Sequence, residues 1–231
     1  MPMFQTMTAK TRELLVEFQT LMTGRSSLID SVAPPLVFGV VYTIVGLSWA
    51  IAGALAAASA IAILRLRRRQ PLAYAAGGLA GVGLAAAVTL WMGTAESYFL
   101  PSVISGGVTL LAAVISLLVG RPMVAWTSFV ARRWPLRWYW HPRVRPAYSE
   151  VTWLWVIFFA LRFLLQLNLL QNQQATLLAV LTVLTGWPST IVLLIASYLY
   201  GTWRLRQLGG PSVQEFRDGA LPPWQGQTRG F

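Results

Sequence analysis

The segment Val151–Leu170, with the sequence VTWLWVIFFALRFLLQLNLL, constrains the fold more than any other part of the chain. Its residues are almost all large and apolar. A helix of about 20 residues is about 30 Å long, which matches the hydrocarbon thickness of a bilayer. The segment therefore predicts a helix that crosses a membrane.

Arg162 is the one charged residue in this segment. An arginine at the centre of a membrane helix costs about 2.5–3.5 kcal/mol on insertion scales, so such residues usually face protein or a cavity. One interpretation is structural: Arg162 makes a hydrogen bond between helices or extends towards an interface. The other is that Arg162 takes a direct part in binding or transport.

Polar neighbours of Arg162 favour a site on this helix. Gln166 follows Arg162 by four residues and shares its face, and Asn168 lies close by. We predict Arg162, Gln166 and Asn168 as ligand- or lipid-binding residues. Candidate acidic partners are Asp30, Glu96 and Glu150.

Composition extends the membrane prediction to the whole chain. Of 231 residues, 56% are hydrophobic and 11% are charged, whereas soluble domains carry about 25% charge. The apolar residues form long blocks, which is typical of membrane-spanning helices. We predict an all-α integral membrane protein with six hydrophobic segments: 34–46, 49–64, 71–92, 98–119, 151–170 and 176–203.

Two of these segments have predicted irregularities. The first two segments form a short hairpin around Gly46-Leu47-Ser48, because the uncharged run from Val32 to Leu64 is too long for one crossing and short for two. The first arm either crosses or is re-entrant. The last segment is kinked or broken around Gly186-Trp187-Pro188.

The basic residues predict the topology. The net charge is +11, and of 18 basic residues Arg162 alone falls outside the predicted cytoplasmic segments. Basic residues concentrate in cytoplasmic loops, so both termini are predicted to be cytoplasmic. This explanation takes precedence over nucleic-acid binding, and the same charges would attract anionic lipids.

The flanking regions give three further predictions. Residues 1–29 form an amphipathic interfacial segment, with a helix at Thr8–Met22, or else a frayed tail. Residues 30–206 form the polytopic membrane domain. Residues 207–231, rich in Gly, Pro and Gln, form a mobile C-terminal tail.

The cytoplasmic loop 120–150 mixes basic and aromatic residues. This mixture is typical of a segment at the level of the lipid headgroups. Pro122–Trp134 is predicted to form an interfacial helix. The predicted interfacial lipid contacts are Arg132, Arg133, Trp134, Arg137, Trp138 and Trp140.

Catalytic constellations are missing from the sequence. There is no cysteine, one histidine (His141), and no phosphate-binding glycine loop. His141 is interpreted as an ordinary loop residue, the alternative being a contact to a pigment, haem or phosphate. Asp30, Glu96 and Glu150 are too far apart in sequence to suggest a pair of carboxylates for general acid–base catalysis. We therefore expect no enzyme, no catalytic residues, no metal and no cofactor.

Several short motifs carry a resemblance to a known family. They are Ala33-Pro34-Pro35-Leu36-Val37-Phe38, Glu96-Ser97-Tyr98-Phe99, Gly120-Arg121-Pro122-Met123, Glu150-Val151-Thr152-Trp153-Leu154-Trp155 and Ser197-Tyr198-Leu199-Tyr200. In order and spacing they resemble the bacterial intracellular septation protein A family, and still more its actinobacterial relative of unknown function. The resemblance implies a small multi-pass protein of the bacterial cytoplasmic (inner) membrane, linked to upkeep of the cell envelope.

Two functional hypotheses follow. The first is a non-enzymatic accessory or scaffold component of a cell-envelope or other membrane complex, with a membrane-protein partner or a second copy of itself. The alternative is a small transporter or lipid-binding protein with a site around Arg162.

Overall fold

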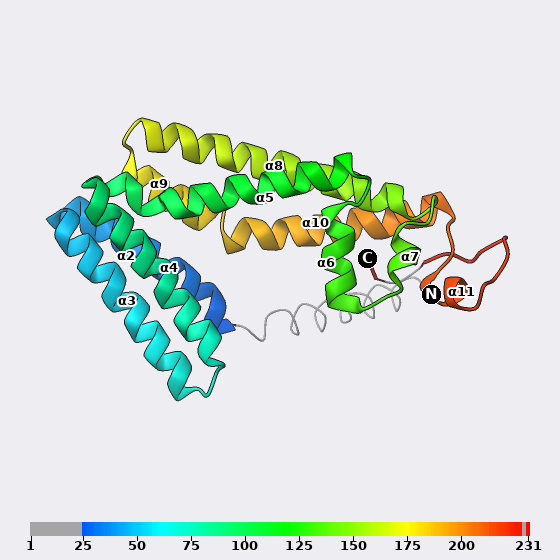
Figure 1. Ribbon diagram of the computed structural model, residues 1–231, viewed down its shortest axis with the longest axis horizontal. Coiled ribbons are helices and arrows are strands. Elements are labelled where there is room, and N and C mark those ends of the chain that lie inside the picture. The colour runs from blue at the N-terminus through cyan, green and yellow to red at the C-terminus, as the bar shows by residue number, and fades with distance from the viewer. Residues whose placement is uncertain (1–24, 228–229) are drawn as a thin grey trace, which may run out of the picture. The chain divides into compact units, whose positions relative to one another are not determined.

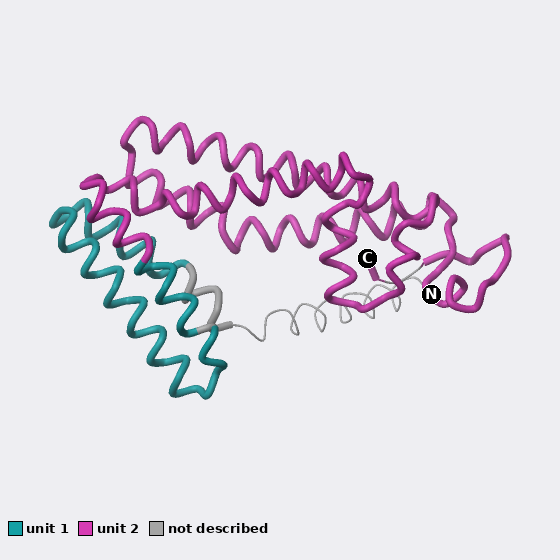
Figure 2. The backbone as a smooth tube through the Cα atoms, viewed as in Figure 1, with its two compact units in different colours: residues 1–83 teal, residues 84–231 magenta. Residues whose placement is uncertain are grey.

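The computed structural model describes residues 25–227 and 230–231, except for the side chains of residues 25–31 and Tyr74. This part of the chain contains helices and no strands, which confirms the all-α prediction. The predicted helix at Thr8–Met22 lies outside the described residues. The chain divides into two compact units, residues 1–83 and 84–231 (Figure 2).

Unit 1 contains a helical hairpin of α2 (Arg25–Val45) and α3 (Leu47–Arg67) (Figure 1). The chain reverses at Gly46, whose φ of 91° lies in the left-handed region that favours glycine. This confirms the predicted break at Gly46-Leu47-Ser48. A one-residue connection leaves few backbone groups outside a helix, as apolar surroundings require.

The hairpin is held together by small residues. Ala50, Ala54, Ala58 and Ala62 recur every four residues along α3 and are at most 9% exposed. A Cβ added at Gly53 would come within 3.2 Å of Val37 on α2. Close approach of this kind replaces the hydrophobic driving force that membrane helices lack towards one another.

The start of α2 differs from the prediction. Segment 34–46 was expected to begin near Pro34, but the helix begins at Arg25 and contains Pro34 and Pro35 in its interior. Proline removes a backbone donor without preventing helical φ, so two prolines interrupt the hydrogen-bond ladder while the helix continues. The apolar part of this helix, Val32–Val45, is shorter than a full span.

Helix α4 (Leu72–Met92) carries four glycines, at a spacing that suits close packing against a neighbouring helix. In the described structure, a Cβ added at Gly77, Gly78, Gly81 or Gly83 would meet no atom within 4 Å. No partner of this glycine face is therefore shown by the structure.

Unit 2 places its long helices side by side (Figure 1). Helix α5 packs along α8, and α8 packs against both α9 and α10. Two shorter helices, α6 and α7, follow α5 in the chain, and α6 also packs against α8. The elements of this unit are η1 (Ala95–Phe99), α5 (Leu100–Leu118), α6 (Met123–Arg132), α7 (Leu136–Tyr139), α8 (Arg145–Gln171), α9 (Ala175–Leu184), α10 (Trp187–Leu208) and α11 (Val213–Arg217).

The predicted break in the last hydrophobic segment is present between α9 and α10. Pro188 has no N–H, so the carbonyl of Leu184 loses its helical donor. The Ser189 hydroxyl donates to that carbonyl instead, at 2.7 Å. The next carbonyl, that of Thr185, receives its donor from another helix, as described below.

Five helical stretches are long and apolar enough to cross a membrane: Leu47–Arg67, Ala75–Met92, Ala95–Leu118, Arg145–Gln171 and Ala175–Leu208. The last of these contains the α9–α10 break. The described chain is therefore compatible with a multi-pass membrane protein. The predicted number of crossings and the orientation of the termini stay predictions.

The C-terminal segment is folded rather than extended away as a mobile tail. Ser212 and Glu215 form a capping box at the start of α11. The Glu215 carboxylate also accepts hydrogen bonds from the backbone N–H groups of Gln225 and Gly226. These backbone donors, first that of Ser212, lower the pKa of Glu215 to about 2.

Phe231 anchors this segment to the helices. Its ring stacks on the Tyr148 ring, with centroids 4.3 Å apart and an interplanar angle of 9°. The Arg132 Nε donates to the Phe231 main-chain oxygen at 3.1 Å. The ring lies directly over Gly201 of α10, where any side chain would collide with it.

Substitution of Gly201 tests this anchor. A Cβ at position 201 would clash with the Phe231 ring, so Gly201→Ala should displace Phe231 and destabilise the fold by about 1–3 kcal/mol, as overpacking does. Limited proteolysis in detergent should show faster cleavage within residues 209–227. Gly78→Ala is the matched control, because nothing obstructs its methyl group; equal cleavage of both variants would contradict the anchor.

Candidate functional site

An aromatic cluster at one end of unit 2 joins segments that are distant in sequence. It consists of Trp134, Trp138, Tyr139, Tyr148 and Phe231, and is called the aromatic layer below. Trp138, Tyr139 and Tyr148 are 0% exposed. Their rings meet edge to face, with centroids 5.1–6.1 Å apart, the arrangement that aromatic quadrupoles favour.

Hydrogen bonds fix the orientation of these rings. The Trp138 Nε1 donates to the Pro211 carbonyl at 2.8 Å. The hydroxyl groups of Tyr139 and Ser128 lie 3.2 Å apart. Burial raises the pKa of Tyr139, so this phenol stays protonated at neutral pH. The layer thus binds the segment after α10 to α6 and α7.

Arginines stack on tryptophans around the layer. Arg121 lies over Trp140 at 4.4 Å, Arg132 over Trp134 at 5.1 Å, and Arg143 over Trp224 at 5.5 Å from the ring centroid. Each is within the range of a cation–π interaction. Such stacking holds one arginine, Arg132, on the aromatic layer itself and two others on tryptophans outside it.

The predicted lipid-contact residues divide into two groups. Arg133 and Arg137 are exposed, and Arg132, Trp134 and Trp140 are partly exposed. Trp138, by contrast, is fully buried and is excluded as a lipid contact. The composition of the loop did not indicate that Trp138 would be covered by the segment that follows α10, to which its Nε1 donates at Pro211.

His141 lies at the edge of the layer, near Phe216 and Trp224. Its Nδ1 accepts a hydrogen bond from the backbone N–H of Arg143 at 3.2 Å. Burial, followed by the charge of Arg143, lowers the pKa of His141, so the ring is neutral at pH 7. Its described contacts are those of a structural loop residue.

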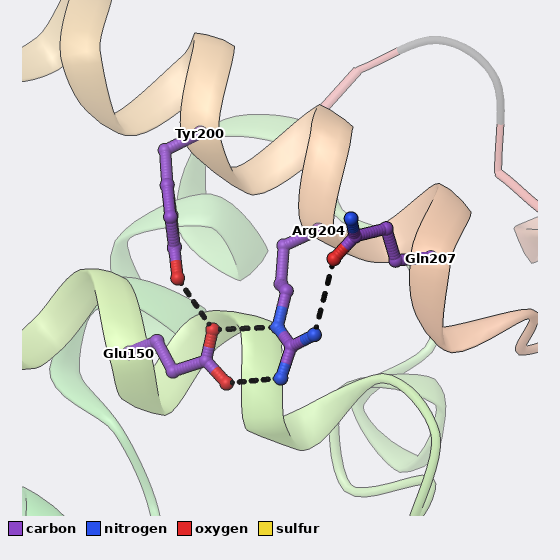
Figure 3. A network of polar contacts seen from close by, with 4 residues as sticks. All are labelled: Glu150, Tyr200, Arg204 and Gln207. Carbon is purple, nitrogen blue, oxygen red and sulfur yellow. Dashed lines mark hydrogen bonds and ion pairs between the residues drawn. The ribbon is translucent and has the colours of Figure 1, made fainter.

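A second polar group connects α8 to α10 (Figure 3). The Arg204 Nε and Nη2 donate to the two carboxylate oxygens of Glu150 at 2.7 and 2.8 Å. The Tyr200 hydroxyl donates to the same carboxylate at 2.8 Å, and Arg204 Nη1 donates to Gln207 at 3.2 Å. Glu150, a predicted candidate partner of Arg162, therefore forms its ion pair with Arg204 instead.

Arg162 lies about 14 Å from the end of α8 at Gln171, by the helical rise. Its Nη1 donates to the Thr185 carbonyl at 3.0 Å. The guanidinium thereby supplies a donor at the C-terminal end of α9, where a positive charge also suits the helix dipole. This contact is the structural role that the sequence left open.

The structure brings two of the three predicted site residues together. The side chain of Gln166 is 0% exposed, and its Nε2 donates to Thr182 of α9 at 3.3 Å. Asn168 is exposed, and its carbonyl accepts hydrogen bonds from Asn172. A position two residues from Gln166 lies on a different side of the helix, so Asn168 is not part of the group formed by Arg162 and Gln166.

A cavity of about 150 Å³ adjoins Arg162. Its α8 wall consists of Phe159, Arg162 and Phe163. Its α5 wall consists of Ser102, Ser105, Gly106 and Thr109. The α5 residues were not predicted as site residues, although their spacing of three, four and seven places them on one face of a helix.

The described residues contain no group of three or more His, Cys, Asp or Glu side chains that could hold a metal ion. In this part of the chain, no carboxylate forms an ion pair with Arg162. What the geometry offers is an open, hydrogen-bonding cavity between α5 and α8, with Ser105 exposed at its wall, and an aromatic–basic surface at one end of unit 2.

A family model described as "Protein of unknown function (DUF3159)" matches residues 22–206. The match includes α2 through most of α10, and so both the cavity and most of the aromatic layer. No curated protein and no solved structure matches the chain.

Loss of the α8–α10 ion pair should destabilise unit 2. Glu150→Gln leaves Arg204 without its bidentate partner, and we expect the midpoint of thermal unfolding in detergent to fall by about 2–4 °C. Arg204→Gln should cause a similar fall. The double variant should lose less than the sum of the two, because they remove one shared interaction; full additivity would contradict the pairing.

Proposed function

We propose that this chain, which belongs to the DUF3159 family of proteins of unknown function, is a non-enzymatic integral membrane protein. In this proposal it acts as an accessory or scaffold subunit of a membrane complex in the bacterial cytoplasmic membrane. The observation that carries the proposal is the aromatic layer, which joins residues 134–148 to Pro211 and Phe231 beside a surface that bears arginines.

The use of polar side chains supports a scaffold. Glu150 and Arg204 hold α8 to α10. Trp155 donates to Ser197 at 2.8 Å across the same two helices, and Gln166 donates to Thr182 of α9. These groups connect helices, whereas acid/base catalysis requires titratable groups that converge on one reacting position.

The surface of the layer suits anionic groups at a membrane face. Arg133 and Arg137 are exposed, and Trp126 is 42% exposed. Each basic residue near an anionic leaflet contributes about 1 kcal/mol of attraction. Anionic lipids, and a membrane-protein partner or a second copy of the chain, are the proposed partners; nucleic acid is not.

The proposed orientation puts this surface and both termini on the cytoplasmic side. Arg65, Arg67, Arg68 and Arg69 at the end of α3 and the arginines of residues 120–150 belong to that side by the positive-inside rule. The uncharged segments 93–95 and 171–174 then face outwards.

The alternative function is a small transporter or a lipid-binding protein with its site around Arg162. One specific observation favours it, namely the cavity between α5 and α8. The discontinuous α9–α10 stretch beside this cavity also resembles the broken helices that line sites in transporters.

Reporter fusions test the orientation. A reporter fused after Phe231 should be active as a cytoplasmic protein, and one inserted between Gln173 and Gln174 should be active outside. Matched phosphatase and fluorescent-protein fusions give opposite signals on the two sides. An extracytoplasmic signal from the fusion after Phe231 would contradict the proposed topology.

Co-purification tests the scaffold function. Membranes solubilised in mild detergent should yield a partner protein in a fixed ratio to this chain. The double variant Arg133→Gln/Arg137→Gln should reduce recovery of that partner at least about tenfold if two charge-assisted contacts are lost.

The matched control is Arg67→Gln/Arg68→Gln, which removes the same charge from exposed positions in unit 1. This control should leave recovery of the partner unchanged. If the wild-type chain yields no stoichiometric protein and runs as a monomer, the scaffold proposal fails.

A further inference from the structure

Two buried polar atoms without hydrogen-bond partners lie near the cavity between α5 and α8. They are Arg162 Nε and Gln166 Oε1, two of the three such side-chain atoms found among the described residues. Buried polar groups are nearly always satisfied, by protein or by a bound group. Of the two, Arg162 lines the cavity, and its Nε is a donor without an acceptor, so the cavity calls for an occupant that accepts hydrogen bonds.

The α5 wall supplies further hydrogen-bonding groups. Ser102, Ser105 and Thr109 line the cavity, and the Thr109 hydroxyl donates to the Ser105 carbonyl at 2.9 Å. No hydrogen bond of the Ser102 or Ser105 hydroxyl is found in the described structure, so both can donate to an occupant. Gly106 completes this wall. A Cβ added at Gly106 would lie 3.8 Å from Gln166 Oε1.

The same chain shows what the free edge of a guanidinium binds. Arg204 uses Nε and Nη2 to hold the two oxygens of Glu150. Arg162 uses Nη1 on the Thr185 carbonyl, which leaves its own Nε and Nη2 edge without a described partner. That edge matches the two-oxygen geometry of a carboxylate or a phosphate.

The charge of Arg162 also favours an anionic occupant. Arg162 sits within an apolar stretch of α8, and no described carboxylate neutralises it. A charge removed from water is stabilised by an opposite charge at hydrogen-bonding distance. An anionic occupant would supply that charge, whereas a lipid acyl chain would leave both the charge and the Arg162 Nε donor uncompensated.

We infer that this cavity binds an anionic oxygen group, a phosphate or a carboxylate, on the Nε/Nη2 edge of Arg162. The hydroxyl groups of Ser102 and Ser105 donate to the remaining oxygens. Because Nε is buried, the ligand meets Nη2 first, and a rotation of the Arg162 side chain then brings Nε into contact. This inference is independent of the scaffold function proposed for the aromatic layer.

The anionic group has two possible sources, a lipid headgroup and a free small anion. Both present the same oxygens to Arg162, so the test has two arms. The first arm titrates purified wild-type protein in nonionic detergent with inorganic phosphate or acetate, against sodium chloride at equal ionic strength. The second arm uses native mass spectrometry of protein taken from nanodiscs with and without phosphatidylglycerol.

A free anion should raise the midpoint of thermal unfolding saturably, by about 5 °C at a hundredfold excess over its Kd. If the source is a lipid, free anions should have little effect, and one phosphatidylglycerol per chain should be retained. Either result supports the site. Failure of both arms would leave water as the occupant and overturn the inference.

Three variants assign the binding to this cavity. Arg162→Lys keeps the charge but lacks the two-donor edge, and Ser105→Phe fills the cavity from α5; each should weaken binding at least about tenfold. Ile104→Phe adds the same ring at a neighbouring position that does not line the cavity and is 56% exposed, so it should bind as the wild type does.

Should Arg162→Lys fail to fold, Ser105→Phe carries the test alone, because it leaves the Arg162–Thr185 contact intact. Unchanged affinity in a folded Ser105→Phe protein would place the ligand elsewhere and overturn the inference. The co-purification result does not bear on this outcome, so failure of either proposal can be recognised separately.

Discussion

The need to satisfy every backbone carbonyl in apolar surroundings governs the arrangement of this chain. Helices satisfy most carbonyls internally, and the α2–α3 turn is reduced to one glycine. The α9–α10 break is where this solution fails, because Pro188 and the turn at Gly186 leave carbonyls without helical donors. Ser189 supplies one donor from within the helix, and Arg162 supplies the other from α8.

That requirement explains how an arginine is tolerated in an otherwise apolar stretch. One nitrogen of Arg162, Nη1, donates to the Thr185 carbonyl at the break. Arg162 also lines a cavity whose α5 wall carries serines, a glycine and a threonine. A structural contact and a binding edge can therefore coexist on one side chain, so the two interpretations of Arg162 are not exclusive.

Local features of the sequence predicted the helices and both of their breaks. Long apolar runs require helices, and Gly46 and Pro188 have backbone constraints that do not depend on the surroundings. The fold of residues 209–227, and the position of Phe231, could not be predicted in this way. It depends on the fit of Phe231 over Gly201 and against Tyr148, which joins three segments far apart in sequence.

The candidate site was predictable to a similar extent. The charge of Arg162 and the four-residue spacing to Gln166 identified one wall. The α5 wall was missed because serine and threonine are common in membrane helices, although the spacing of Ser102, Ser105, Gly106 and Thr109 was visible. Burial of Trp138 depends on Pro211, whose carbonyl it binds, and a loop composition cannot show such a long-range contact.

The stack of Phe231 on Tyr148 has a consequence for biogenesis. It joins Tyr148, in the first turns of α8, to a residue that follows α9, α10 and α11, so the contact cannot form until the chain has been made through Phe231. During that interval Tyr148 and Gly201 lack the Phe231 ring that covers them. The aromatic layer is therefore a late step of assembly, and a chain stalled before it would present these groups at the membrane surface.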